Sequence, residues 1–114
     1  MSDASTSDVV LVLTSLPDRE MALKLAQALV EKQLAACVSV LAECTSVYRW
    51  KGKLETAREV PVQIKIRSAC YPEVEAAIRE HHPYELPEIL VVPVVRGLPG
   101  YLQWVAAETT PPKG

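Results

Sequence analysis

Branched apolar side chains occupy every second position from Val60 to Ile66, and one proline and three polar residues fill the positions between and after them. Successive side chains of a strand point to opposite faces, so this segment is predicted to be a strand with one face in a core and one polar face. Pro61 has no amide hydrogen, so it should lie where the strand needs no donor. The chain must therefore build a sheet that is covered on one side.

The rest of the sequence predicts three more strands and three helices. Apolar residues recur at helical spacing after Asp18, which can cap a helix, and after Pro72, which can open one. The expected elements are a strand at 9–13, a helix from about 18 to 32, a strand at 36–41 that resumes at 47–50, a turn at 51–53 with a return arm from Leu54, a helix between 72 and 83, a strand at 89–95 with Pro93 at an edge or bulge, and a helix at 101–108.

This order predicts an α+β fold, a ferredoxin-like βαββαβ sandwich with a long hairpin between its second and third strands and a short C-terminal helix. Residues 9–108 would form the single domain, between a flexible N-terminus at 1–8 and a flexible tail at 109–114. The hairpin over 41–57 is too long to pack within one small domain. Exposed sheet edges invite pairing, so we expect a closed homo-oligomer joined through its strands.

Composition and charge exclude several classes of protein. Hydrophobic residues make up 49% of the chain, and 12 Lys and Arg against 14 Asp and Glu leave a net charge of −2. A nearly neutral chain lacks the basic surface that a nucleic-acid binder needs, so no nucleic-acid partner is expected. No apolar run is long enough to span a membrane, and the first residues do not resemble a signal peptide. Three cysteines without a paired spacing are expected to be free thiols, so we expect a cytoplasmic protein.

The two histidines, His81 and His82, form the sharpest cluster of chemically reactive side chains. Imidazole is a good ligand for Cu, Zn and Ni, but adjacent helical residues point about 100° apart and do not readily chelate one ion. One histidine could bind metal with Glu88 or with a cysteine that folding brings near. Alternatively, His81 packs at the base of the helix and His82 caps carbonyls at its end.

Other candidates also have two interpretations. Cys37 is either a small buried residue, or a soft metal ligand or redox thiol. Tyr48 and Trp50, two apart on a strand, form either a ligand platform or an interface anchor. Lys65 and Arg67 could bind an anion in a cleft between subunits, or could be ordinary surface. None of the common catalytic motifs occurs, so no enzyme activity is expected.

Five segments in order closely resemble the CutA divalent-cation-tolerance family, and the resemblance covers about residues 9–108. These are Leu34–Val38 (LAACV), Ser46–Glu55 (SVYRWKGKLE), Glu59 with Lys65, His82–Ile89 (HPYELPEI) and Tyr101–Trp104 (YLQW). The resemblance implies a tight homotrimer with its sheets turned inward. It also implies a role in tolerance to divalent cations, with Cu(II) as the expected metal and no organic cofactor.

The resemblance also suggests site residues. A bacterial copper site of this family uses two histidines, matched by His81 and His82, and a cysteine at the end of the first strand, where this chain has Thr14. As an alternative, a signalling or scaffold trimer could bind a small anion or a protein in clefts between subunits. The residues expected to line such a cleft are Cys37, Tyr48, Trp50, Lys65, Tyr84 and Glu88.

Overall fold

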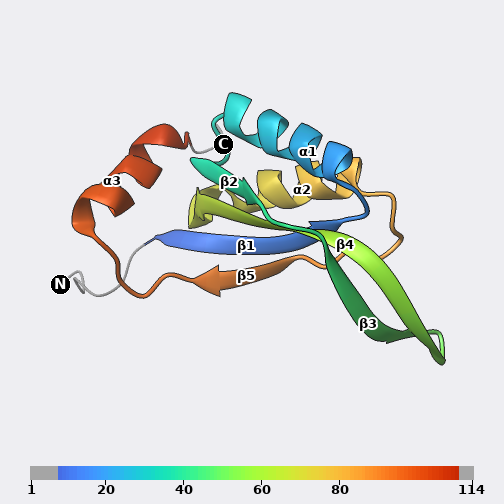
Figure 1. The fold of residues 1–114 in the computed structure, drawn as a ribbon. Coiled ribbons are helices and arrows are strands. Elements are labelled where there is room, and N and C mark those ends of the chain that lie inside the picture. Colours follow the sequence, from blue (N-terminus) through green and yellow to red (C-terminus); the bar gives the residue numbers. More distant parts are fainter. Residues whose placement is uncertain (1–7, 111–114) are drawn as a thin grey trace.

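The computed structural model describes residues 8–110 and confirms the predicted α+β class (Figure 1). The elements alternate in the predicted order, except that the second predicted strand is divided into two. Their bounds are β1 Val9–Leu16, α1 Arg19–Glu31, β2 Cys37–Val40, β3 Cys44–Trp50, β4 Lys53–Arg67, a 3-10 turn Ser68–Cys70, α2 Tyr71–His81, β5 Leu90–Pro93 and α3 Pro99–Glu108.

The sheet is antiparallel throughout and has the strand order β2-β4-β1-β5. In the central pair, Val10 lies opposite Ile66 and Val12 lies opposite Ile64. These side chains are buried beneath α1 and α2, which lie together on one face of the sheet (Figure 1). The alternation at 60–67 therefore does place one face of β4 in the core, as predicted.

The second predicted strand is interrupted at residues 41–43, and its two parts pair with different halves of β4. β2 pairs with the half of β4 inside the sheet, whereas β3 pairs with the half that begins at Lys53 and projects beyond the sheet (Figure 1). Lys51 and Gly52 form the hairpin turn, and both have positive φ, at 51° and 81°. The projecting hairpin raises the radius of gyration to 15.1 Å, against about 13 Å for a compact chain of this length.

The last strand and helix differ slightly from their predicted bounds. β5 is an edge strand, as expected from Pro93, but it is only four residues long. α3 begins at Pro99, two residues earlier than expected, and contacts β4 and β1. The ammonium of Lys65, on the sheet face opposite α1 and α2, lies 5.8 Å from the ring of Tyr101 in α3. Thus α3 covers one end of the second sheet face and leaves the remainder of that face uncovered by this chain.

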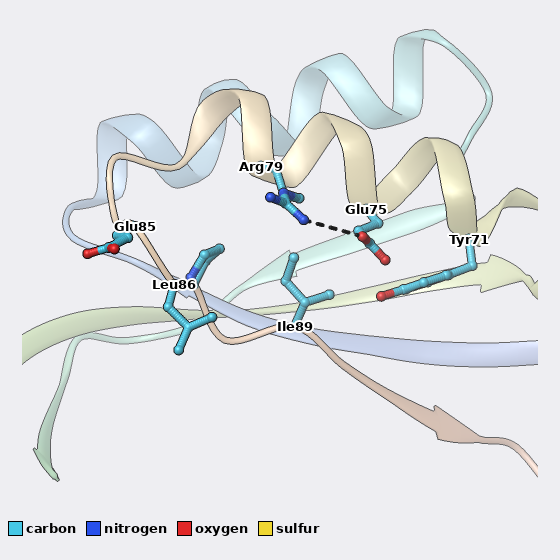
Figure 2. A pocket seen from close by; sticks show the side chains of 7 residues that line it. Tyr71, Glu75, Arg79, Glu85, Leu86 and Ile89 are labelled. Atoms are coloured by element: carbon cyan, nitrogen blue, oxygen red, sulfur yellow. Dashed lines mark ion pairs between the residues drawn. The ribbon is translucent and has the colours of Figure 1, made fainter. Parts of the chain in front are cut away.

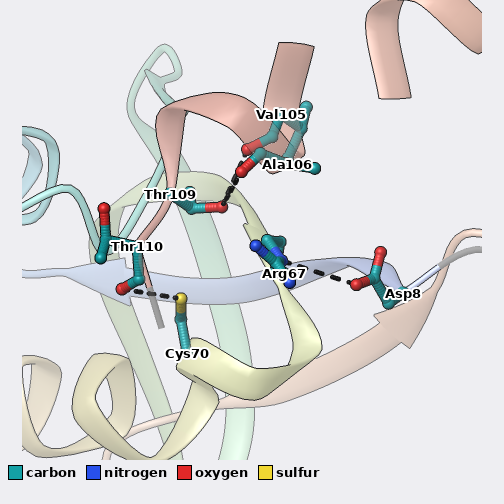
Figure 3. Close-up of polar contacts among 7 residues, drawn as sticks. All are labelled: Asp8, Arg67, Cys70, Val105, Ala106, Thr109 and Thr110. Atoms are coloured by element: carbon teal, nitrogen blue, oxygen red, sulfur yellow. Dashed lines mark hydrogen bonds and ion pairs between the residues drawn. The ribbon is translucent and has the colours of Figure 1, made fainter. Parts of the chain in front are cut away.

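The residues after α3 are tied to the domain, which differs from the loose tail expected for 109–114 (Figure 3). The Thr109 hydroxyl donates to the Val105 carbonyl at 2.8 Å, and the Cys70 thiol lies 3.7 Å from the Thr110 carbonyl. The Thr110 amide donates to Gln33 in the loop after α1 at 2.9 Å. Residues 111–114 and 1–7 lie outside the described part of the chain, where the remaining predicted flexible segments fall.

The three cysteines differ in how deeply they are buried. Cys44 is exposed, Cys37 is half-buried and Cys70 is buried, and all three are free thiols, as expected. Burial raises the pKa of the Cys70 thiol above its ordinary value, partly offset by the nearby Arg67. Across residues 8–110, no helix combines the length and the apolar character needed to cross a membrane.

Candidate binding cleft

A cleft of about 730 Å³ lies between the β3–β4 hairpin and the loop that follows α2. The hairpin contributes Ser46, Tyr48, Trp50 and Glu59, and the loop contributes Pro83–Glu88. Ser46, Tyr48 and Trp50 alternate along β3, and Glu59 belongs to the same face because its register partner is Cys44. The period of two therefore aligns these four side chains along one wall.

Aromatic rings and carboxylates dominate the cleft. Tyr48, Trp50 and Tyr84 are 40%, 37% and 39% exposed, so part of each residue is accessible to a ligand. The carboxylates are those of Glu59, Glu85 and Glu88, and no lysine, arginine or histidine is among the residues that line the cleft. This cleft therefore favours a cation and disfavours the small anion that was considered above.

One ammonium of the chain itself lies at the edge of the cleft. Lys51, in the hairpin turn, places its Nζ 5.6 Å from the centre of the Trp50 ring and 4.0 Å from Glu85 Oε1. Both side chains of the ion pair are largely exposed, so the pair contributes little to stability. Its position nevertheless shows how an ammonium fits between a ring and a carboxylate here.

Tyr84 is held at the other wall by its backbone and ring. Its ring centre lies 4.7 Å from that of His82. Burial raises the pKa of the Tyr84 phenol above its ordinary value, and the negative charge of Glu59 raises it further, followed by a smaller effect of Tyr48. Tyr84 and Glu59 thus line the same cleft although 25 positions separate them in the sequence.

His82 is buried, with 7% of its surface exposed, and both of its ring nitrogens are engaged. Its Nδ1 accepts a hydrogen bond from the Tyr84 amide at 3.1 Å, so Nδ1 carries no proton. Its Nε2 lies 2.6 Å from the Ser15 carbonyl, which can only accept, so Nε2 is the protonated nitrogen. His82 therefore joins the loop after α2 to the end of β1 and has no free lone pair for a metal.

His81 differs from its neighbour. Its Nδ1 donates to the Ala77 carbonyl one helical turn earlier at 2.9 Å, so in the neutral imidazole Nε2 is the nitrogen with the lone pair. Nε2 has no hydrogen-bond partner within residues 8–110. His81 is half-buried, so this nitrogen remains the available imidazole ligand of the pair.

The other metal ligands considered do not gather around His81. Within residues 8–110, no group of three His, Cys, Asp or Glu side chains is arranged to hold a metal ion. Glu88 lines the cleft, and Cys37 lies on β2. Metal binding by the two histidines stays a prediction, and one copy of the described chain does not supply a complete shell for it.

Cys37 and Lys65 lie apart from the cleft and next to each other. They are register partners on β2 and β4, with Lys65 Nζ 4.0 Å from Cys37 Sγ. The predicted cleft set is thus divided into Tyr48, Trp50, Tyr84 and Glu88 on one side and this pair on the other. Neither Glu59 nor Glu85 was among the predicted cleft residues, although both lie in segments that carry the family resemblance. Strand alternation indicated that Ser46 lies on the same face as Tyr48. No local feature of the sequence indicated which loop lies opposite this face.

A smaller pocket of about 220 Å³ lies behind the same loop, between it and α2 (Figure 2). Glu75 and Arg79 form an ion pair at 3.8 Å along α2, and burial raises the pKa of Tyr71 beside them, with a further contribution from its hydrogen bond to Glu75. The Glu85 carboxylate points away from Arg79 in this view, consistent with its pairing to Lys51. Glu85, Leu86 and Pro87 therefore form a wall shared by both hollows.

Comparison with known proteins matches both the sequence and the fold of this chain to one family. The family model described as CutA1 divalent ion tolerance protein matches residues 10–108. A divalent-cation tolerance protein CutA from Pectobacterium atrosepticum is 41% identical over 107 residues, which cover 94% of this chain and 97% of that protein. The crystal structure of CutA1 from Shewanella sp. SIB1 has a TM-score of 0.88 at 38% identity and covers 91% of this chain and 97% of its own.

Animal relatives match over a shorter share of their length. The mouse protein named CutA is 45% identical over 89 residues, which are 78% of this chain and 50% of the mouse protein. The chain therefore spans about half the length of the mammalian relatives that it matches.

Proposed function

The chain belongs to the CutA1 divalent ion tolerance protein family, and from this premise we propose that it is a homotrimeric protein of divalent-cation tolerance that binds metal without catalysis. Cu(II) is the metal we propose, because it is the strongest binder among divalent first-row ions at nitrogen sites. The observation that carries the metal proposal is the unpartnered Nε2 of His81.

The proposed roles of the two histidines differ. His81 supplies the metal ligand, and His82 positions it by joining the start of the loop to Ser15. Because three potential ligands do not meet within residues 8–110, the remaining ligands are proposed to come from a neighbouring copy. The metal site would then exist only in the assembled protein.

Exposed apolar surface supports the proposed self-association. On the sheet face opposite α1 and α2, Leu90 and Val92 of the edge strand β5 are 55% and 39% exposed, beside half-buried Leu11 and Leu13 of β1. Val47 and Leu54 add exposed apolar surface on the projecting hairpin. Contiguous apolar surface next to an open strand edge is typical of an interface. A cytoplasmic location is proposed on the basis of the three free thiols.

Copper titration of single variants tests this assignment. Calorimetry should show Cu(II) binding to the unmodified protein and its loss in His81→Ala, with the nitrogen hyperfine pattern in electron paramagnetic resonance reporting imidazole coordination. His82→Ala should retain the imidazole signal but lower the stability by about 2 kcal/mol, because it leaves a buried carbonyl and the Tyr84 amide without partners. Unchanged Cu(II) affinity in a folded, assembled His81→Ala variant would refute the proposal.

A further inference from the structure

We propose that the cleft between the β3–β4 hairpin and the loop 83–88 binds linear aliphatic polyammonium ions. This inference goes beyond the metal proposal and does not depend on it, since it uses neither histidine as a ligand. It rests on the shape of the cleft, on the distribution of its charges and on the ammonium that already lies at its edge.

The charges of the cleft are spread along its length. Trp50 and Glu85 lie toward the hairpin turn, where Lys51 contacts both. Glu59 lies toward the base of the hairpin, because its partner Cys44 is six residues before Trp50, about 20 Å along an extended strand. Within residues 8–110, the carboxylates of the cleft do not form a group of three ligands that could hold a metal ion. They suit a ligand whose positive charges are themselves separated.

Aromatic rings occupy the space between these charges. Tyr48 lies between Trp50 and Ser46 on the same wall, and Tyr84 lines the cleft from the loop. Ring faces attract ammonium groups and also pack against methylene groups, so they accept both parts of an alkyl polyamine. A neutral apolar ligand would leave the carboxylates unpaired, and an anion would be repelled by them.

The ammonium of Lys51 already makes the contacts that we propose for an ammonium group of the ligand. It occupies the position between the Trp50 ring and Glu85 that the terminal ammonium of a ligand would take. Because both partners of this ion pair are exposed, an incoming ammonium can displace it at little cost. The lysine is therefore an internal competitor, and removing its charge should strengthen ligand binding.

Calorimetric titration with spermidine tests the proposal. We expect saturable binding, and about tenfold weaker binding in Glu59→Gln, which removes one charge-assisted hydrogen bond without changing the shape of the side chain. Glu31→Gln removes the same charge from the exposed end of α1 and should leave the affinity unchanged. The neutral 1,8-octanediol should not bind. Circular dichroism and the association state confirm that each variant is folded.

Removal of the Lys51 charge should have the opposite effect on the affinity for spermidine. Lys51→Asn, chosen because asparagine tolerates the positive φ of this position, should bind spermidine more tightly than the unmodified protein. Lys24→Gln, on α1, changes the net charge equally and should have no effect. The proposal is overturned if spermidine gives no binding heat, or if the variants distant from the cleft change the affinity as much as those within it. Cu(II) binding is measured separately, so its failure and the failure of this proposal are distinguishable.

Discussion

The side chain of Thr14 is buried in the core, but its hydroxyl makes no hydrogen bond within residues 8–110. It lies opposite Val62 on the face of the sheet that α1 and α2 cover, and only 2% of its surface is exposed. Its Oγ1 is buried without a hydrogen-bond partner in the described part of the chain. A hydroxyl in such a place loses its hydration and gains nothing in return.

Replacing Thr14 with valine should therefore stabilise the protein. Valine has nearly the same shape without the hydroxyl, so the free energy of unfolding should rise by about 1 kcal/mol in urea denaturation at fixed protein concentration. Thr14→Ser, which keeps the hydroxyl and removes the methyl group, should be less stable than the unmodified protein. A loss of stability in Thr14→Val would contradict the prediction that the buried hydroxyl is unfavourable.

At the scale of single elements, the start of α1 is fixed by a capping side chain. α1 starts after Asp18, whose Oδ1 accepts a hydrogen bond from the Met21 amide at 2.8 Å. This satisfies one of the amides that a helix leaves unpaired in its first turn. The prediction that Asp18 caps this helix is confirmed.

Asp18→Ala should lower the free energy of unfolding by about 1 kcal/mol because the Met21 amide loses its acceptor. Asp18→Asn retains a side-chain oxygen and should recover most of the loss, which distinguishes capping from a general effect of charge. Both are measured by urea denaturation under the same conditions. Equal destabilisation by the two variants would show that the charge, and not the hydrogen bond, stabilises the helix start.

At the scale of the whole molecule, the projecting hairpin and the uncovered sheet face are the dominant features. One chain buries the face beneath α1 and α2, but α3 covers only one end of the other face. Exposed Val92 lies on that uncovered face opposite Leu11. The proposed trimer would bury this surface.

Light scattering after size-exclusion chromatography should accordingly give three times the chain mass of 12.5 kDa. Val92→Glu should shift the protein toward smaller species, because it places a charge in the proposed interface. Leu23→Glu, the same kind of change at an exposed position of α1, should leave the mass unchanged. A monomer at micromolar concentration, or equal effects of the two variants, would contradict the proposed assembly.

The elements were largely predictable because their signals are local. Alternation at 60–67 indicated a half-buried strand, Asp18 and Pro72 indicated helix starts, and Pro93 indicated an edge strand. The sequence allowed a strand at 36–41 that resumes at 47–50, but it did not show that the two parts pair with different halves of the long strand β4. Thr109 and Thr110 were expected to be loose because their partners, such as Gln33 and Cys70, are distant in the sequence.

The sequence by itself determined the residue types available for binding, namely two histidines beside a tyrosine and carboxylates, and two aromatic residues on one strand face. Only the tertiary structure decided their roles. It engaged both nitrogens of His82, left Nε2 of His81 without a partner within residues 8–110, and placed Glu59 and Tyr84 in one cleft while it kept Lys65 with Cys37. Periodicity records which way a side chain points from its own backbone, whereas lone pairs and clefts depend on segments that meet only when the chain folds.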